Sequence, residues 1–139
     1  MKQFTLLILS ITLLTGITAC QNKKIEIPST TASLRSVYFD YDQALIRYDA
    51  ATAMKGNADY LKQHASMNVT IEGNCDNRGT NEYNLALAHR RAESTKNYLM
   101  NLGINNARLR SISYGEERPV CTQDNESCWQ RNRRADFRH

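Results

Sequence analysis

"NVTIEGNCDNRGTNEYNLALAHRRA", residues 68–92, is the stretch that decides the fold predicted for this chain. It passes from a short apolar run typical of a β-strand, through a polar loop, into a long helix. The apolar residues of that helix, from Leu85 to Leu102, recur at steps of three and four, and Gly103 follows where such a helix ends. A strand followed by a loop and a helix predicts a layered domain in which the helix packs on a sheet.

The segments on either side continue this alternation of strands and helices. Val37, Phe39 and Tyr41 alternate with more polar residues, which is the period of a strand. Strands are therefore predicted at residues 37–42, 68–73, 109–115 and 133–139, helices at 49–64 and 81–102, a polar loop at 115–126 and a helical turn at 127–132. Asp49 is predicted to cap the first helix. The predicted fold class is α/β (α+β), a two-layer sandwich with a mixed, roughly four-stranded sheet and two main helices on one face.

The first twenty residues predict export and lipidation. They have the layout of a secretory signal, with a lysine, an apolar run too short to span a bilayer comfortably, and then small residues. Their end, "ITAC", resembles the lipobox of bacterial lipoproteins, in which the cysteine is diacylated and becomes the first residue. The alternative is a secreted protein in which Cys20 is incidental. We predict a lipoprotein signal peptide at residues 1–19, a lipidated N-terminus and flexible linker at 20–36, and one domain at 37–139.

The net charge bears on the kind of partner, and the residue after the lipobox bears on the membrane in which the protein is anchored. The chain has 18 Lys and Arg against 14 Asp and Glu, and the net charge of +4 is dispersed, which does not favour nucleic acid as a partner. Gln21 follows Cys20, where an aspartate is the usual signal for retention in the inner membrane. The sequence therefore favours the outer membrane, with the domain in the periplasm.

The remaining cysteines predict one disulfide. Cys121 and Cys128 bracket the polar run "TQDNES", through which the chain can fold back, and export permits a disulfide. We predict that these two pair and that Cys75 stays reduced as a small apolar filler. A zinc pair is the alternative for Cys121 and Cys128, but no second ligand pair follows and the three histidines are scattered.

The loop at residues 72–84 is a weak candidate for catalysis or for metal binding. Cys75 and Asp76 have no histidine in the same loop to act as a base. Paired carboxylates for glycoside hydrolysis need a substrate groove, for which a domain of this size leaves little room. The loop also lacks the alternating oxygen ligands of a calcium site. We predict no enzyme activity, no metal and no cofactor.

Recognition of a doubly charged ligand fits this loop better. Arg91 follows Asp76 by fifteen positions and lies on the edge of the apolar stripe of the long helix. A zwitterion would place its ammonium on Asp76 and its carboxylate on Arg91, in bidentate contact with the guanidinium. The alternative is a salt bridge between Asp76 and Arg91 that only pins the loop, and spacing alone does not separate the two.

Four motifs carry a resemblance to a known family. "VYFDYD", "EGNCDNRGTNEYNLALAHRRA", "SYGEERP" and "NRRADF" resemble the peptidoglycan-associated lipoproteins, members of the OmpA-like C-terminal domain family, from about Val37 to the C-terminus. The resemblance implies non-covalent binding of the diaminopimelate-containing peptide stem of peptidoglycan. It implies that Asp76 and Arg91 grip the free amino-acid end of that residue. The further pocket positions that it implies are Asp40, Phe39, Thr80, Asn84, Leu87 and Arg133.

The resemblance also implies partners and a cellular role. Such lipoproteins bind the periplasmic protein TolB and tether the outer membrane to the cell wall within the Tol-Pal system, which acts in envelope integrity and cell division. Two other hypotheses remain: an adaptor that acts mainly through protein partners outside the Tol system, and a small hydrolase of cell-wall peptides.

Overall fold

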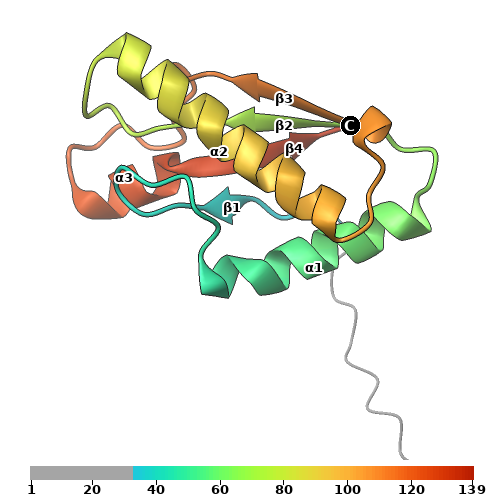
Figure 1. Ribbon diagram of the computed structural model, residues 1–139. Helices are drawn as coiled ribbons and strands as arrows, with labels where there is room; N and C mark the ends of the chain where they lie inside the picture. Colours follow the sequence, from blue (N-terminus) through green and yellow to red (C-terminus); the bar gives the residue numbers. More distant parts are fainter. Residues whose placement is uncertain (1–32) are drawn as a thin grey trace, which may run out of the picture.

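The computed structural model describes residues 33–139, and the predicted signal peptide, the lipidation at Cys20 and most of the predicted linker lie outside these residues. In the described part, a sheet forms one layer and two long helices form the other (Figure 1). The elements in chain order are β1 (Val37–Tyr38), α1 (Tyr48–Gln63), β2 (Val69–Gly73), α2 (Asn81–Asn101), the 3-10 turn η1 (Asn106–Arg108), β3 (Leu109–Ser113), α3 (Glu126–Asn132) and β4 (Arg134–Arg138). None of the helices in the described part is long and apolar enough to cross a membrane.

The sheet is mixed, with the strand order β1-β4-β2-β3. β2 and β3 are parallel, because the chain returns through α2 between them, whereas β4 is antiparallel to both of its neighbours. Both long helices lie on the same face of the sheet (Figure 1). The predicted fold class is therefore confirmed.

The core lies between the sheet and the two helices. Ile71 and Leu109 face it from neighbouring strands, Leu61 from α1, and Leu99 from α2. These positions follow the strand period of two and the helix spacing of three and four that the sequence shows. The other face of the sheet is not covered by a long helix (Figure 1); Arg110 and Arg138 are exposed there, whereas Glu72 and Arg134 are buried by their neighbours.

The first predicted strand and the first predicted helix cap differ from the structure. β1 has only two residues, because the carbonyl groups of Phe39 and Asp40 accept hydrogen bonds from buried arginines instead of continuing the ladder. Asp42 then turns the chain with a φ of 55°. Asp49 does not cap α1: it lies in the first turn and bonds to Arg47, which stands at the cap position without a side-chain cap.

Gly73 allows β2 and α2 to approach closely. A Cβ at this position would lie 1.9 Å from the carbonyl oxygen of Ala88, which is far inside contact distance. Only glycine fits without a shift of the main chain. The loop that follows β2 consequently starts directly beside α2, and this contact positions the site.

Candidate ligand-binding site

A small cavity lies where the loop after β2 meets the first turns of α2. Its volume is about 150 Å³. Its lining residues come from four segments of the chain: Tyr41, Asp42, Cys75, Asp76, Arg78, Gly79, Tyr83, Asn84, Leu87, Arg91 and Arg133. Asp76 and Arg91, fifteen positions apart in the sequence, therefore border the same space.

Main-chain hydrogen bonds fix the loop that carries Asp76. Asn74 donates its N–H to a carbonyl at the start of β4 over 2.8 Å, and Cys75 donates to the carbonyl of Gly115 over 2.7 Å. The side-chain amide of Asn84 donates to the carbonyl of Asp76 over 3.2 Å. Because these bonds reach β4, the segment after β3, and α2, the position of Asp76 is set by the fold.

The carboxylate of Asp76 is buried and held by two arginines. Arg78 donates to it from its guanidinium over 2.8 Å and from its main-chain N–H over 3.1 Å, and Arg133 donates from its guanidinium over 3.1 Å. Burial by itself would raise the pKa of Asp76, but these hydrogen bonds outweigh it and hold the pKa below its ordinary value. The site therefore contains a fixed negative charge at neutral pH.

Arg91 is a buried cation that is bonded mainly to carbonyl groups. Only 1% of the residue is exposed. Its guanidinium donates to the carbonyl oxygens of Gln43 (2.8 Å), Asn74 (3.0 Å) and Asp40 (3.1 Å), and to the sulfur of Cys75 (3.2 Å). Burial lowers the pKa of Arg91 from its ordinary value. All three guanidinium nitrogens are already bonded to the chain, so only part of the donor fork remains for a ligand. The prediction of a bidentate contact between a ligand carboxylate and Arg91 had assumed a free fork.

Asp76 and Arg91 do not neutralise each other. Within residues 33–139, Asp76 makes its ion pairs with Arg78 and Arg133, and Arg91 has no carboxylate within ion-pair distance. The alternative of a salt bridge that pins the loop is therefore wrong. The cavity contains two carboxylates and three guanidinium groups, and it can accept a ligand that carries charges of both signs.

Three of the six further predicted pocket positions line the cavity, and three do not. Asn84, Leu87 and Arg133 line it. The side chain of Asp40 instead points outward and pairs with Arg47 over 2.9 Å, and only its carbonyl serves the site. The ring of Phe39 is fully buried, 5.3 Å from the guanidinium of Arg91, and Thr80 caps α2. These three side chains do not line the cavity, and their contact with a ligand stays a prediction.

Arg78 is the main residue of the cavity that the sequence analysis missed. Its guanidinium lies between the rings of Tyr41 (4.2 Å) and Trp129 (4.1 Å), while it bonds to Asp76. Its Nε is buried and has no hydrogen-bond partner in the described structure. Arg78 lies inside residues 68–92, but the aromatic residues that hold it come from segments 37 positions before it and 51 positions after it. Local spacing gave no sign of that stack.

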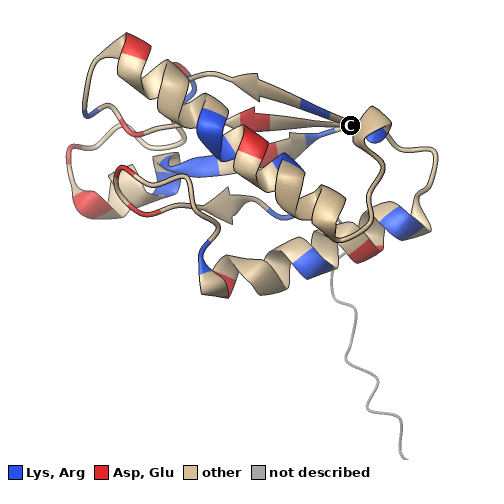
Figure 2. Ribbon diagram, viewed as in Figure 1, with Lys and Arg blue, Asp and Glu red and all other residues tan. Residues whose placement is uncertain are grey.

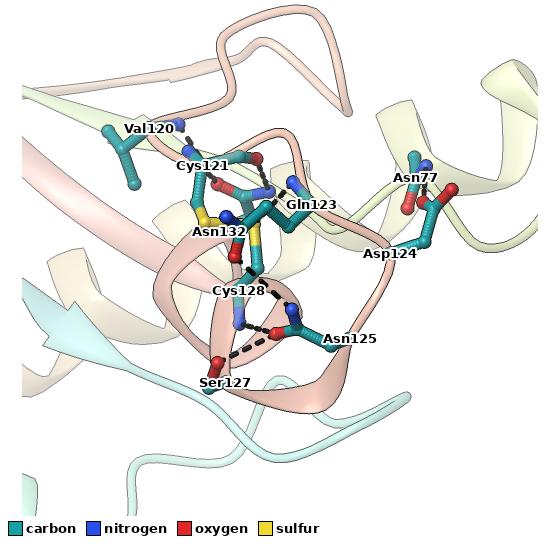
Figure 3. The surroundings of a disulfide bond; sticks show 9 residues. All are labelled: Asn77, Val120, Cys121, Gln123, Asp124, Asn125, Ser127, Cys128 and Asn132. Atoms are coloured by element: carbon teal, nitrogen blue, oxygen red, sulfur yellow. Dashed lines mark hydrogen bonds between the residues drawn. A yellow bond between two sulfur atoms is a disulfide. The ribbon is translucent and has the colours of Figure 1, made fainter.

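The predicted disulfide is present beside this site (Figure 3). Cys121 and Cys128 are joined, with their Cα atoms 5.3 Å apart, and the side chain of Asn132 bonds to the main chain of Cys121 on both its donor and acceptor sides. The bridge fixes the loop that leads into α3, which supplies Trp129 to the Arg78 stack. Cys75 is reduced and buried, and burial raises the pKa of its thiol to about 11.

The fold and this cavity define the class of the protein. The OmpA family model matches residues 38–133, which includes every residue that lines the cavity. The chain belongs to the OmpA family.

Two of the relatives to which the chain is similar are peptidoglycan-associated lipoproteins. A peptidoglycan-associated lipoprotein of Brucella melitensis is 48% identical over 99 residues, which cover 71% of this chain and 59% of the relative. The chain thus matches less than two thirds of that relative's length. One from Pseudomonas putida is 43% identical over 113 residues, covering 79% of this chain and 68% of the relative.

Solved structures agree with this placement. The peptidoglycan-associated lipoprotein from Burkholderia pseudomallei is 43% identical and superposes with a TM-score of 0.72, over 74% of this chain and 87% of that chain. The C-terminal domain of Helicobacter pylori MotB superposes with a TM-score of 0.70 over 76% of this chain and 83% of that chain, at 20% identity. The second likeness shows the fold alone.

Proposed function

We propose that this domain binds the peptide stem of peptidoglycan without a covalent bond, and that the cavity receives the amino-acid end of its diaminopimelate residue. The single observation that carries the proposal is the pair of opposite buried charges, Asp76 and Arg91, which border one cavity without pairing to each other. The names of the relatives support the same ligand class.

The charges in the cavity match the two charged groups of such a ligand. Oδ1 of Asp76 accepts one main-chain N–H, so this oxygen has room for a ligand ammonium. A ligand carboxylate would meet Arg91, and Arg78 stands at the same cavity with an unpartnered Nε. A carboxylate at this position would compensate a buried cation that the described chain itself leaves unpaired, and charge-assisted bonds of this kind are strong.

The proposal extends to attachment of the membrane to the wall. Acyl chains on Cys20 would hold the protein in the outer membrane, with the domain in the periplasm. Because the stems repeat along the wall and the anchor raises the local concentration, weak single contacts would sum to firm attachment. TolB is the proposed protein partner, within a Tol-Pal system that acts in envelope integrity and cell division. The proposed function is binding and attachment, and it includes no catalysed reaction.

Ligand chemistry tests the proposal without altering the fold. The chain is titrated by calorimetry with a stem tripeptide that ends in meso-diaminopimelate and with the matched tripeptide that ends in lysine, which lacks the second carboxylate. We expect binding to weaken at least tenfold with lysine, since a charge-assisted bond contributes about 1.5–3 kcal/mol. Equal affinity for the two tripeptides would overturn the assignment.

Retention on purified sacculi tests the residues. Asp76→Asn should reduce retention, whereas Asp59→Asn, an exposed carboxylate on α1, is the matched control and should not. Mass spectrometry of the muropeptides after incubation checks for new fragments. Their appearance would favour the hydrolase hypothesis over the binding module.

A further inference from the structure

The face of the sheet that the helices leave uncovered has an excess of arginine. Ile71, Leu109 and Ala135 belong to the core, so their strand neighbours point to the opposite side. Five arginines lie on this face or on the segments that border it, with two carboxylates among them: Arg110, Arg118, Arg131, Arg134 and Arg138, with Glu72 and Asp136. Figure 2 shows basic positions on β3 and at both ends of β4. We refer to these seven residues as the arginine face.

The internal ion pairs of the arginine face leave positive charge over. Arg134 bonds to Asp136 over 2.8 Å, while Arg118 and Arg138 share Glu72 at 3.5 and 3.4 Å. The remaining two arginines, Arg110 and Arg131, are exposed and have no ion pair within residues 33–139. Five cations against two anions give these seven residues a net charge of +3, whereas residues 33–139 as a whole, with 15 Lys and Arg against 13 Asp and Glu, have a net charge of +2.

The N-terminal segment joins the domain at this same face. Leu34 and Ser36 line one groove with Arg131 and Arg138, and the hydroxyl of Ser36 donates to Asp136 over 2.6 Å. Ser33, the first described residue, follows Cys20 by thirteen positions, which is a contour of roughly 45 Å at most. A lipid on Cys20 would therefore keep this face within reach of the membrane surface.

The ligand cavity lies elsewhere on the molecule. Its residues come from α2, from the loops at residues 41–42 and 75–79, and from Arg133, and none of them is a member of the arginine face. Contact through the sheet therefore leaves the cavity open to a ligand on the other side. The two surfaces can be occupied at the same time.

We propose that the arginine face docks the domain on an anionic phospholipid surface. The inference rests on the proposed function, because the lipid anchor places the domain near a membrane. The positive charge of the arginine face is the reason for choosing an anionic lipid as its partner. Each basic residue near such a surface strengthens binding about fivefold, and the effect fades within a Debye length. The anchor multiplies this weak contact by keeping the face close to the headgroups. Docking would hold the domain with its cavity turned away from the membrane.

The test uses residues 20–139 with Cys20→Ser, which contain the whole described domain and lack the acyl chains. Co-sedimentation measures binding to vesicles of pure phosphatidylglycerol and of pure phosphatidylcholine at low salt. The double variant Arg110→Gln and Arg131→Gln removes the two arginines that have no ion pair. Its matched control, Lys55→Gln and Lys62→Gln, removes the same charge from exposed positions on α1 in the opposite layer.

We expect binding to phosphatidylglycerol vesicles to fall at least tenfold in the arginine variant and less than threefold in the lysine variant, with no binding to phosphatidylcholine. Equal losses in the two variants would show that only net charge acts, and absence of binding by the parent chain would also overturn the proposal. Sedimentation equilibrium that shows a dimer of the parent chain, lost in the arginine variant, together with absent vesicle binding, would assign the face to a second copy. Retention of the same variants on sacculi is expected to be unchanged. Sacculus retention therefore reports on the proposed wall binding, and vesicle co-sedimentation reports separately on docking.

Discussion

Replacing Arg91 by lysine keeps the positive charge beside the cavity but removes the planar fork that joins three segments of the chain. The guanidinium bonds to carbonyl groups of Gln43 and Asp40, which lie before α1, and of Asn74, which follows β2. Lysine has one ammonium on a flexible stem and does not reproduce a fork of fixed geometry. We expect the lysine to retain one of these bonds and to lose the other two.

The size of the effect follows from those bonds. A hydrogen bond to a charged donor contributes about 1.5–3 kcal/mol, so the loss of two should lower the free energy of unfolding by about 3 kcal/mol or more. A domain of this size typically has a stability of about 5–15 kcal/mol, so the variant should still fold. The affinity of the variant for a diaminopimelate tripeptide should fall as well. Arg91 lines the cavity and bonds to the segments that carry Asp40 and Asn74, so loss of these bonds would shift the walls of the cavity.

Urea unfolding followed by circular dichroism measures the change, with an unaltered m value as the check that the unfolded states match. Arg90→Lys is the matched control: Arg90 is the exposed neighbour on α2, and its replacement should change stability by less than about 0.5 kcal/mol. A loss below about 1 kcal/mol for Arg91→Lys, or equal losses for the two variants, would refute the reasoning that the buried fork holds these segments together.

The remaining predictions concern packing, pH and the two kinds of cysteine. Gly73→Ala should lower the melting temperature strongly, because its Cβ would lie 1.9 Å from a carbonyl oxygen of α2, and an unchanged melting temperature would contradict the close contact. The depressed pKa of Asp76 contributes stability that is present above the unfolded pKa of about 3.9 and is lost as pH falls through the lower folded value. Stability measured between pH 5 and pH 2 should therefore fall less in Asp76→Asn than in the parent chain. Reduction of the Cys121–Cys128 bond should lower the free energy of unfolding by about 2–3 kcal/mol, the loop-closure contribution of so short a ring, with the domain still folded by circular dichroism. Native labelling of Cys75 at pH 7 should be much slower than labelling in denaturant, since its pKa is raised to about 11, and rapid labelling would contradict its burial.

Some features of the site were open to prediction because they are local in the sequence. The loop that carries Asp76 and the face of the helix that carries Arg91 follow from the strand, loop and helix order of one stretch. The disulfide also follows from two nearby cysteines in a chain that its sequence predicts to be exported. Periodicity overestimated the first strand: the alternation predicted a strand over residues 37–42, but β1 ends at Tyr38, where tertiary hydrogen bonds to the following carbonyl groups begin.

The sequence by itself determined the layers of this protein: the strands and helices, the face that each one buries, and the membership of a family whose motifs it carries. Only the tertiary structure decided which charges are bonded to which. Asp76 pairs with Arg133 across 57 positions, and Arg91 bonds to Asp40 across 51. The physical reason is that periodicity is set by the geometry of a single element, whereas a buried hydrogen bond depends on how distant elements are packed together.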